Sequence, residues 1–164
     1  MNFMEVRKEE ESALKIYTFE TKQQIPLSLN EAWDFFSDPN QLSEITPSWM
    51  GFEVKDVPPQ NMYPGMIISY QLKPLYGIKL NWVTEITHVS APHYFVDEQR
   101  FGPYKFWHHQ HHFKETNNGT EMNDIVHYAL PFAIVGRIVH RLNVEKKLNA
   151  IFQYRKNKLN KLFG

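Results

Sequence analysis

The chain has 164 residues, which is the length of one ordinary domain and is enough to bury a single core. Its 18 basic and 18 acidic residues balance, so its charge gives no indication of a nucleic-acid or anionic-lipid partner. No cysteine is present, which excludes disulfide frameworks, thiol nucleophiles and cysteine-based zinc sites.

The first residues differ in kind from the rest. Residues 1–14 mix acidic and basic side chains without the apolar core of a secretory signal, so we expect a flexible, solvated leader before a single domain over residues 15–164. No run of about 18 apolar residues could span a bilayer. We therefore expect a cytoplasmic protein without an integral membrane segment.

A strand and two short helices come next. Residues 16–25 alternate roughly in polarity and predict a first strand. Ser28 and Glu31 have the spacing of a capping box and predict that a helix starts there. Asp38 followed by proline predicts a second short helix that continues through residue 45.

Turn signals then divide the chain into six further strands. Their short connections imply antiparallel neighbours, because a parallel crossover needs a dozen or more residues. The predicted strands are 52–57, 66–72, 77–89, 94–101, 105–115 and 120–130.

The last residues have a helical period. Apolar residues recur at steps of three and four from Val144 to Leu162, with Arg155 in the same series. A similar stripe over residues 135–142 slips in phase near Asn143, where the helix can bend or break. The expected fold class is α+β: a curved antiparallel sheet of about seven strands against a long C-terminal helix, with a ligand pocket between them.

The strand 105–115 has two different faces. The face bracketed by Trp107 and Phe113 is taken as the inner one, and it also carries His109 and His111. Pairing across the Gly102-Pro103 turn places Asp97 opposite His109, Phe95 opposite His111 and Gln99 opposite Trp107.

The following hairpin is predicted from Asn118-Gly119, a favoured two-residue turn. With that turn, Phe113 lies opposite Asp124, His111 opposite Val126 and His109 opposite Tyr128. The polar residues of the inner face are then Asp97, Gln99, His109, His111 and Asp124.

Three interpretations of this polar wall remain open. It is a closed hydrogen-bonded network, or it orients the polar end of a ligand, or it holds a metal through the His-x-His pair and a nearby aspartate. In the second interpretation the body of the ligand lies on Trp82, Trp107, Tyr128 and the final helix. We expect no cofactor and assign no residue as a metal ligand.

The sequence resembles the START/Bet v 1-like (SRPBCC) superfamily, in particular polyketide cyclase/dehydrase-like and cell-division-inhibitor-like ligand-binding proteins. The resemblance implies a helix-grip fold and an apolar or amphipathic small-molecule ligand. Its carriers are Phe95-x-Asp97-x-Gln99, Gly102-Pro103, Trp107-x-His109-x-His111-x-Phe113, Gly119-Thr120, Asp124-x-Val126-x-Tyr128 and Leu148-x-x-Ile151-Phe152-x-Tyr154-Arg155.

Three functions remain open, because one scaffold hosts unrelated activities. The first is binding or transport of a small apolar or amphipathic molecule. The second is a cyclase, dehydratase or isomerase in which His109 or His111, oriented by Asp97 or Asp124, acts as a general base. The third is a module that docks a partner protein in cell-envelope or division processes, and the sequence identifies no such partner.

Overall fold

The computed structural model describes residues 15–56, 61–73, 77–131 and 144–164. Seven strands form one antiparallel sheet in the order β1-β7-β6-β5-β4-β3-β2. The strands are β1 (Tyr17–Ile25), β2 (Glu53–Asp56), β3 (Met66–Leu72), β4 (Leu80–Ser90), β5 (Tyr94–Phe101), β6 (Phe106–Thr116) and β7 (Gly119–Ala129).

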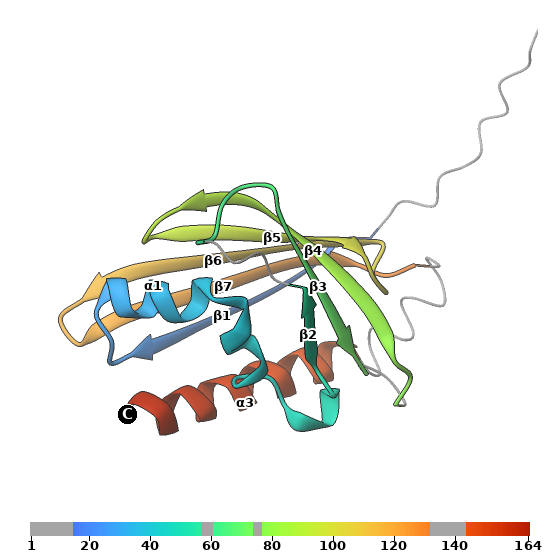
Figure 1. The fold of residues 1–164 in the computed structure, drawn as a ribbon. Helices are drawn as coiled ribbons and strands as arrows, with labels where there is room; N and C mark the ends of the chain where they lie inside the picture. The colour runs from blue at the N-terminus through green and yellow to red at the C-terminus, as the bar shows by residue number, and fades with distance from the viewer. Residues whose placement is uncertain (1–14, 57–60, 74–76, 132–143) are drawn as a thin grey trace, which may run out of the picture.

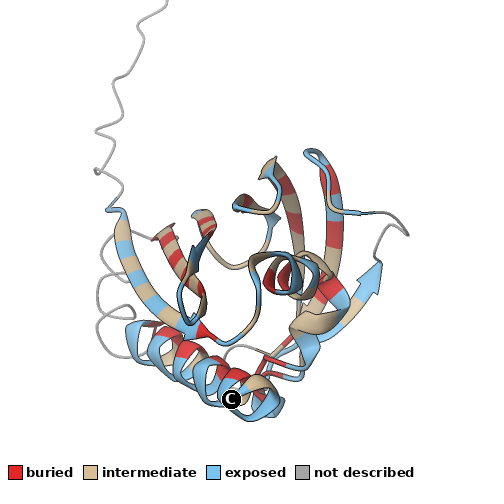
Figure 2. Cartoon of the chain, turned by 90° about the vertical axis from the view of Figure 1, so that its left-hand side faces the viewer, coloured by how far each residue is buried: buried red, intermediate tan, exposed pale blue. Residues whose placement is uncertain are grey.

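The helices lie on one side of this sheet. Between β1 and β2 come α1 (Leu29–Ser37) and the 3-10 helices η1 (Pro39–Ser43) and η2 (Ser48–Met50). The final helix, α3 (Glu145–Phe163), runs beneath the curved sheet (Figure 1). The buried positions of α3 lie on its side toward the sheet, and along β3 and β7 buried positions alternate with less buried ones (Figure 2). The predicted α+β fold class is confirmed.

The seven predicted strands, the helix after Ser28 and the final helix are present, most of them with shifted ends. The strands 66–72 and 94–101 match β3 and β5, and the strand predicted from residue 77 begins at Leu80. The second short helix is the 3-10 helix η1 rather than an α-helix and ends at Ser43, and the further 3-10 helix η2 after Pro47 was not predicted. The leader 1–14 and the stripe 135–142 lie outside the described residues.

Local signals in the sequence determine where α1 and η1 begin. The Ser28 hydroxyl accepts from the Glu31 backbone N–H, and the Glu31 carboxylate accepts from the Ser28 N–H, so the predicted capping box is formed. Trp33 then packs edge-on against Phe95 and Phe113, with ring centroids 5.9 and 6.1 Å apart. These contacts hold α1 over β5 and β6.

The hairpin between β6 and β7 corrects the predicted register. Thr116 pairs with Gly119, so Asn117 and Asn118 form the turn and His111 pairs with Asp124. The predicted pairs of Phe113 with Asp124, His111 with Val126 and His109 with Tyr128 are therefore wrong by two residues. Their face is unchanged, because side chains alternate with a period of two.

Gly119 explains why the turn lies one residue earlier. Its φ is +112°, a conformation that favours glycine, and a Cβ atom there would collide with the carbonyl oxygen of Ile25. The glycine is thus required where β7 begins beside the end of β1, rather than inside the turn. The Thr116 hydroxyl donates to the Gly119 carbonyl and closes the turn.

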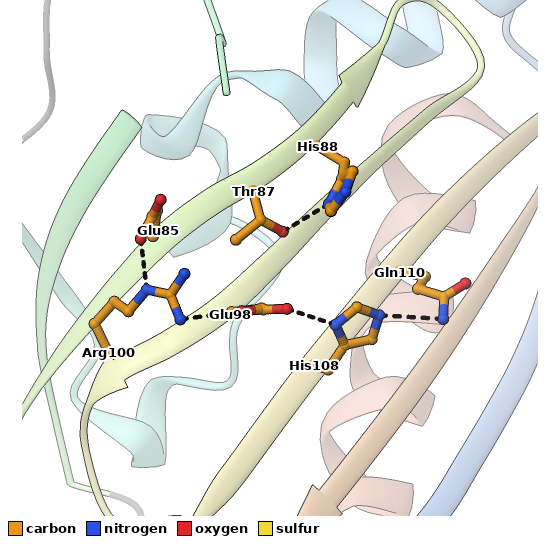
Figure 3. Close-up of polar contacts among 7 residues, drawn as sticks. All are labelled: Glu85, Thr87, His88, Glu98, Arg100, His108 and Gln110. Atoms are coloured by element: carbon orange, nitrogen blue, oxygen red, sulfur yellow. Dashed lines mark hydrogen bonds and ion pairs between the residues drawn. The ribbon is translucent and has the colours of Figure 1, made fainter. Parts of the chain in front are cut away.

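The outer face of β4, β5 and β6 carries a chain of charged and polar contacts (Figure 3). Arg100 donates to Glu85 and to Glu98 at 2.5 and 3.1 Å, and His108 Nδ1 lies 2.8 Å from the Glu98 carboxylate. His108 also contacts Gln110 at 3.3 Å. The even-numbered side chains of β6 therefore face outward, which leaves His109 and His111 on the inner face as predicted.

Candidate functional site

Two histidines and two aspartates form a compact buried cluster on the inner face of β5, β6 and β7. His109 Nδ1 lies 3.3 Å from Asp97 Oδ2, and its Nε2 lies 2.9 Å from Asp124 Oδ1. His111 Nε2 lies 2.9 Å from Asp97 Oδ2, and its Nδ1 lies 3.0 Å from Asp124 Oδ1. Each carboxylate therefore bridges both imidazoles, whose centroids are 3.8 Å apart.

The strand register brings these four residues together. Asp97 pairs with His109, as predicted, and His111 pairs with Asp124 on the other side of β6. Side chains of directly paired residues lie close on one face of a sheet. Phe95 stacks on His111 with centroids 4.1 Å apart and covers that side of the cluster.

The contacts in the cluster differ in quality. The His109 Nε2 contact with Asp124 and the His111 Nε2 contact with Asp97 have hydrogen-bond geometry. The His111 Nδ1 atom is buried and makes no hydrogen bond within the described residues, although it lies 3.0 Å from Asp124 Oδ1. This last contact is therefore a close approach of Nδ1 to the carboxylate oxygen rather than a hydrogen bond.

Opposite charges decide the protonation of the cluster. Burial by itself lowers the pKa of His109, but Asp97 and Asp124 outweigh burial and raise that pKa to about 9. Burial also favours protonated carboxyls, but His109 and His111 hold the pKa of Asp97 and of Asp124 well below the usual range. At neutral pH His109 is therefore a cation between two carboxylates.

A cavity of about 180 Å³ opens between this cluster, α1 with its following 3-10 helices, and α3. The aromatic side of its wall is built by Trp82 and Trp107, whose rings meet edge to face at 5.2 Å. The rest of the wall comes from α1, η1, β3, β4 and α3. Representative lining residues are Phe36, Leu42, Ile68, Thr84, Ile151 and Phe152.

Five of the eight predicted binding residues line this cavity. Asp97, His109 and His111 form its charged end. The remaining two are Trp82 and Trp107. Asp124 is buried behind the histidines and touches both of them.

Gln99 and Tyr128 have other positions than predicted. The Gln99 amide donates to the carbonyl of Tyr104 at 2.7 Å and accepts from the Tyr104 N–H at 3.1 Å, so it closes the β5–β6 turn. The β5–β6 ladder ends at Glu98 and His108, and it includes no pair of Gln99 with Trp107. Tyr128 is buried in a neighbouring apolar cluster and stacks on Tyr17 at 5.6 Å.

Arg155 is a charged cavity residue that the sequence prediction did not include. It lies on α3, is 8% exposed and lines the cavity with its guanidinium 5.0 Å from the ring of Phe152. Its signal was visible, because a lone cation interrupts the apolar series of the last helix. Lining residues from α1 and η1, such as Phe36 and Leu42, carry no comparable signal because their side chains are ordinary core residues.

The guanidinium of Arg155 is not fully hydrogen-bonded within the described part of the chain. Its Nε is buried without a hydrogen-bond acceptor in the described part of the chain. Burial lowers the pKa of Arg155, and the more distant charges of Asp124 and Asp97 partly offset that effect. An arginine remains charged even so, because its guanidinium is not deprotonated in proteins.

The cluster is better arranged for holding charge than for metal binding. One nitrogen of each histidine and an oxygen of Asp97 lie within 4.8 Å of one another. Ligand atoms around a tetrahedral zinc ion lie about 3.4 Å apart, so a metal would require the side chains to move together. It would also replace existing imidazole–carboxylate contacts.

Comparison with known proteins finds similarity in structure only. No protein-family model and no curated protein matches the chain. Protein Ms6760 from Mycobacterium smegmatis is 20% identical with a TM-score of 0.63, over 88% of this chain and 92% of that one. Protein CV1439 from Chromobacterium violaceum is 13% identical with a TM-score of 0.67, over 89% and 96%.

A plant protein with the same architecture identifies the fold. Major latex-like protein 151 from Panax ginseng is 9% identical with a TM-score of 0.66, over 90% of this chain and 97% of that one. The chain has the helix-grip fold of Bet v 1-like proteins. At these identities the similarity shows the fold and not the activity. Within the described residues, no helix of the helix-grip domain is long and apolar enough to cross a membrane.

Proposed function

We propose that this protein binds a small apolar or amphipathic molecule in the cavity between its sheet and α3. The observation that carries the proposal is the cavity itself, which has aromatic and aliphatic walls and a cluster of charged groups at one end. Sites for small molecules commonly combine an apolar lining with a few placed polar groups. A cytoplasmic location is part of the same proposal.

The volume limits the size of the ligand. An apolar cavity of about 150 Å³ can hold benzene. A cavity of about 180 Å³ therefore accommodates a compact molecule or short chain, on the order of ten non-hydrogen atoms. A sterol or a long-chain lipid would require the walls to open.

The protonation of the cluster favours binding over general-base catalysis. A general base must have a free lone pair within reach of the substrate proton. His109 is protonated at neutral pH and has both nitrogens beside carboxylates. His111 Nε2 is hydrogen-bonded to Asp97, and its Nδ1 is buried 3.0 Å from Asp124 Oδ1, away from a substrate proton. The arrangement thus supports an electrostatic wall better than a proton acceptor.

A calorimetric titration with octanol, octanoate, indole and naphthalene tests the proposal. We expect at least one of these probes to bind and to raise the melting temperature, because a ligand of the native state stabilises that state. Ile151→Trp, which fills the cavity from α3, should weaken this binding at least tenfold.

The matched control is Ile67→Trp. Ile67 is 45% exposed and points away from the cavity, whereas its neighbour Ile68 lines it. This variant should bind as the wild type does. Equal binding by Ile151→Trp and Ile67→Trp, or no binding of any of the four probes to the wild type, would contradict the proposed site.

A further inference from the structure

We propose that Arg155 receives the carboxylate of the ligand, so that the cavity selects apolar monocarboxylic acids over their neutral analogues. This inference rests on the proposed function and specifies the ligand class of the same cavity. Arg155 comes from α3 and lines the same cavity as Asp97, His109 and His111.

The first argument is the missing partner of the guanidinium. A buried charge without hydrogen bonds is costly, and buried charges in proteins are normally paired. Arg155 is 8% exposed and its Nε has no acceptor among the described residues, while Asp97 and Asp124 are both engaged by the histidines. A ligand oxygen in the cavity would supply the acceptor that the described residues do not.

The second argument is that neither carboxylate lining the cavity in the described residues is free to pair with Arg155. Asp97 contacts both histidines. Asp38, which also lines the cavity, accepts hydrogen bonds from Asn40 and caps η1 instead.

The third argument is shape. A guanidinium presents its N–H groups as a planar fork that matches the two oxygens of a carboxylate. The ring of Phe152, 5.0 Å from the guanidinium carbon, supports one face of this fork. The remaining cavity, lined by Trp82, Ile68 and Ile151, is apolar and can hold the hydrocarbon part of the acid.

Octanoate and octanol form a matched pair of probes for this inference. They share an eight-carbon chain and differ at the head group. We expect the wild type to bind octanoate at least tenfold more tightly than octanol. Arg155→Met should reduce octanoate affinity at least tenfold more than octanol affinity, because it removes the charge and the fork but keeps an apolar side chain of similar length.

Two further variants control this result. Lys156→Met removes an exposed positive charge from the next position of α3 and should leave the preference for octanoate unchanged. Arg155→Lys keeps the charge but loses the fork, so it should show an intermediate preference. It also provides a test if Arg155→Met does not fold.

The carboxyl resonance of bound ¹³C-labelled octanoate gives a readout that requires no variant. We expect the bound acid to remain ionised at pH 6. A bound neutral acid, or a preference for octanoate that survives Arg155→Met, would overturn the role of Arg155. If octanol binds as tightly as octanoate, the carboxylate preference alone is overturned. If none of the apolar probes binds, the proposed function is overturned.

Discussion

Replacing Asp124 with alanine is expected to reduce the free energy of unfolding by about 3–5 kcal/mol, because it leaves a protonated His109 buried with one of its two carboxylates missing. The same change removes the anion beside His111 Nδ1. Urea unfolding at pH 7, monitored by the fluorescence of the tryptophans, measures this loss.

Glu121→Ala is the matched control for this prediction. Glu121 lies on the same strand, and its side chain is 40% exposed and 4.0 Å from Lys22. An exposed ion pair of this kind contributes little, so the loss should stay within about 0.5 kcal/mol. A loss of similar size in both variants would mean that the buried cluster contributes no more to the free energy of unfolding than an exposed ion pair does.

The stability of the protein is expected to fall as the pH rises from 6.5 to 9. The pKa of His109 is raised from 6.5 to about 9 on folding, so in this interval the native state binds more protons than the unfolded state. The stabilisation is complete below pH 6.5 and is lost as the pH passes the folded pKa. A rise of this size corresponds to about 3 kcal/mol, which urea unfolding over a pH series would detect.

Other perturbed groups titrate outside this interval. Asp97 and Asp124 have lowered pKa values and affect stability only under acidic conditions. Burial, together with His111, lowers the pKa of His112, which therefore changes below pH 6.5. His109→Gln should abolish the slope, whereas His88→Gln, at an exposed site, should retain it. An unchanged slope in His109→Gln would show that another group is responsible.

The fold followed from the sequence because its signals are local and repeated. Alternating polarity marks the strands, prolines and glycines mark the turns between them, and a capping box at Ser28 and Glu31 marks the start of α1. The short connections between strands then require antiparallel neighbours. The pairing of Asp97 with His109 was also predictable, because the β5–β6 connection is short and its turn residues are distinctive.

The residues of the site were only partly predictable. The β6–β7 register depends on Gly119 fitting against Ile25 of β1, which is a contact between distant parts of the chain. Gln99 was assigned to the polar wall from strand alternation, but its side chain closes a turn. Arg155 falls in the apolar series of α3, which indicates a buried position, but periodicity does not show that this position lines a cavity.

The central claim is that a ligand occupies the cavity between the sheet and α3, and its position can be measured directly. Intermolecular nuclear Overhauser effects between ¹³C-labelled octanoate and the protein should connect the chain of the acid to the Trp107 ring and the Ile151 methyl groups. We expect none to the exposed side chain of Ile67. Contacts confined to Ile67 and other exposed side chains, with none to Trp107 or Ile151, would contradict the claim.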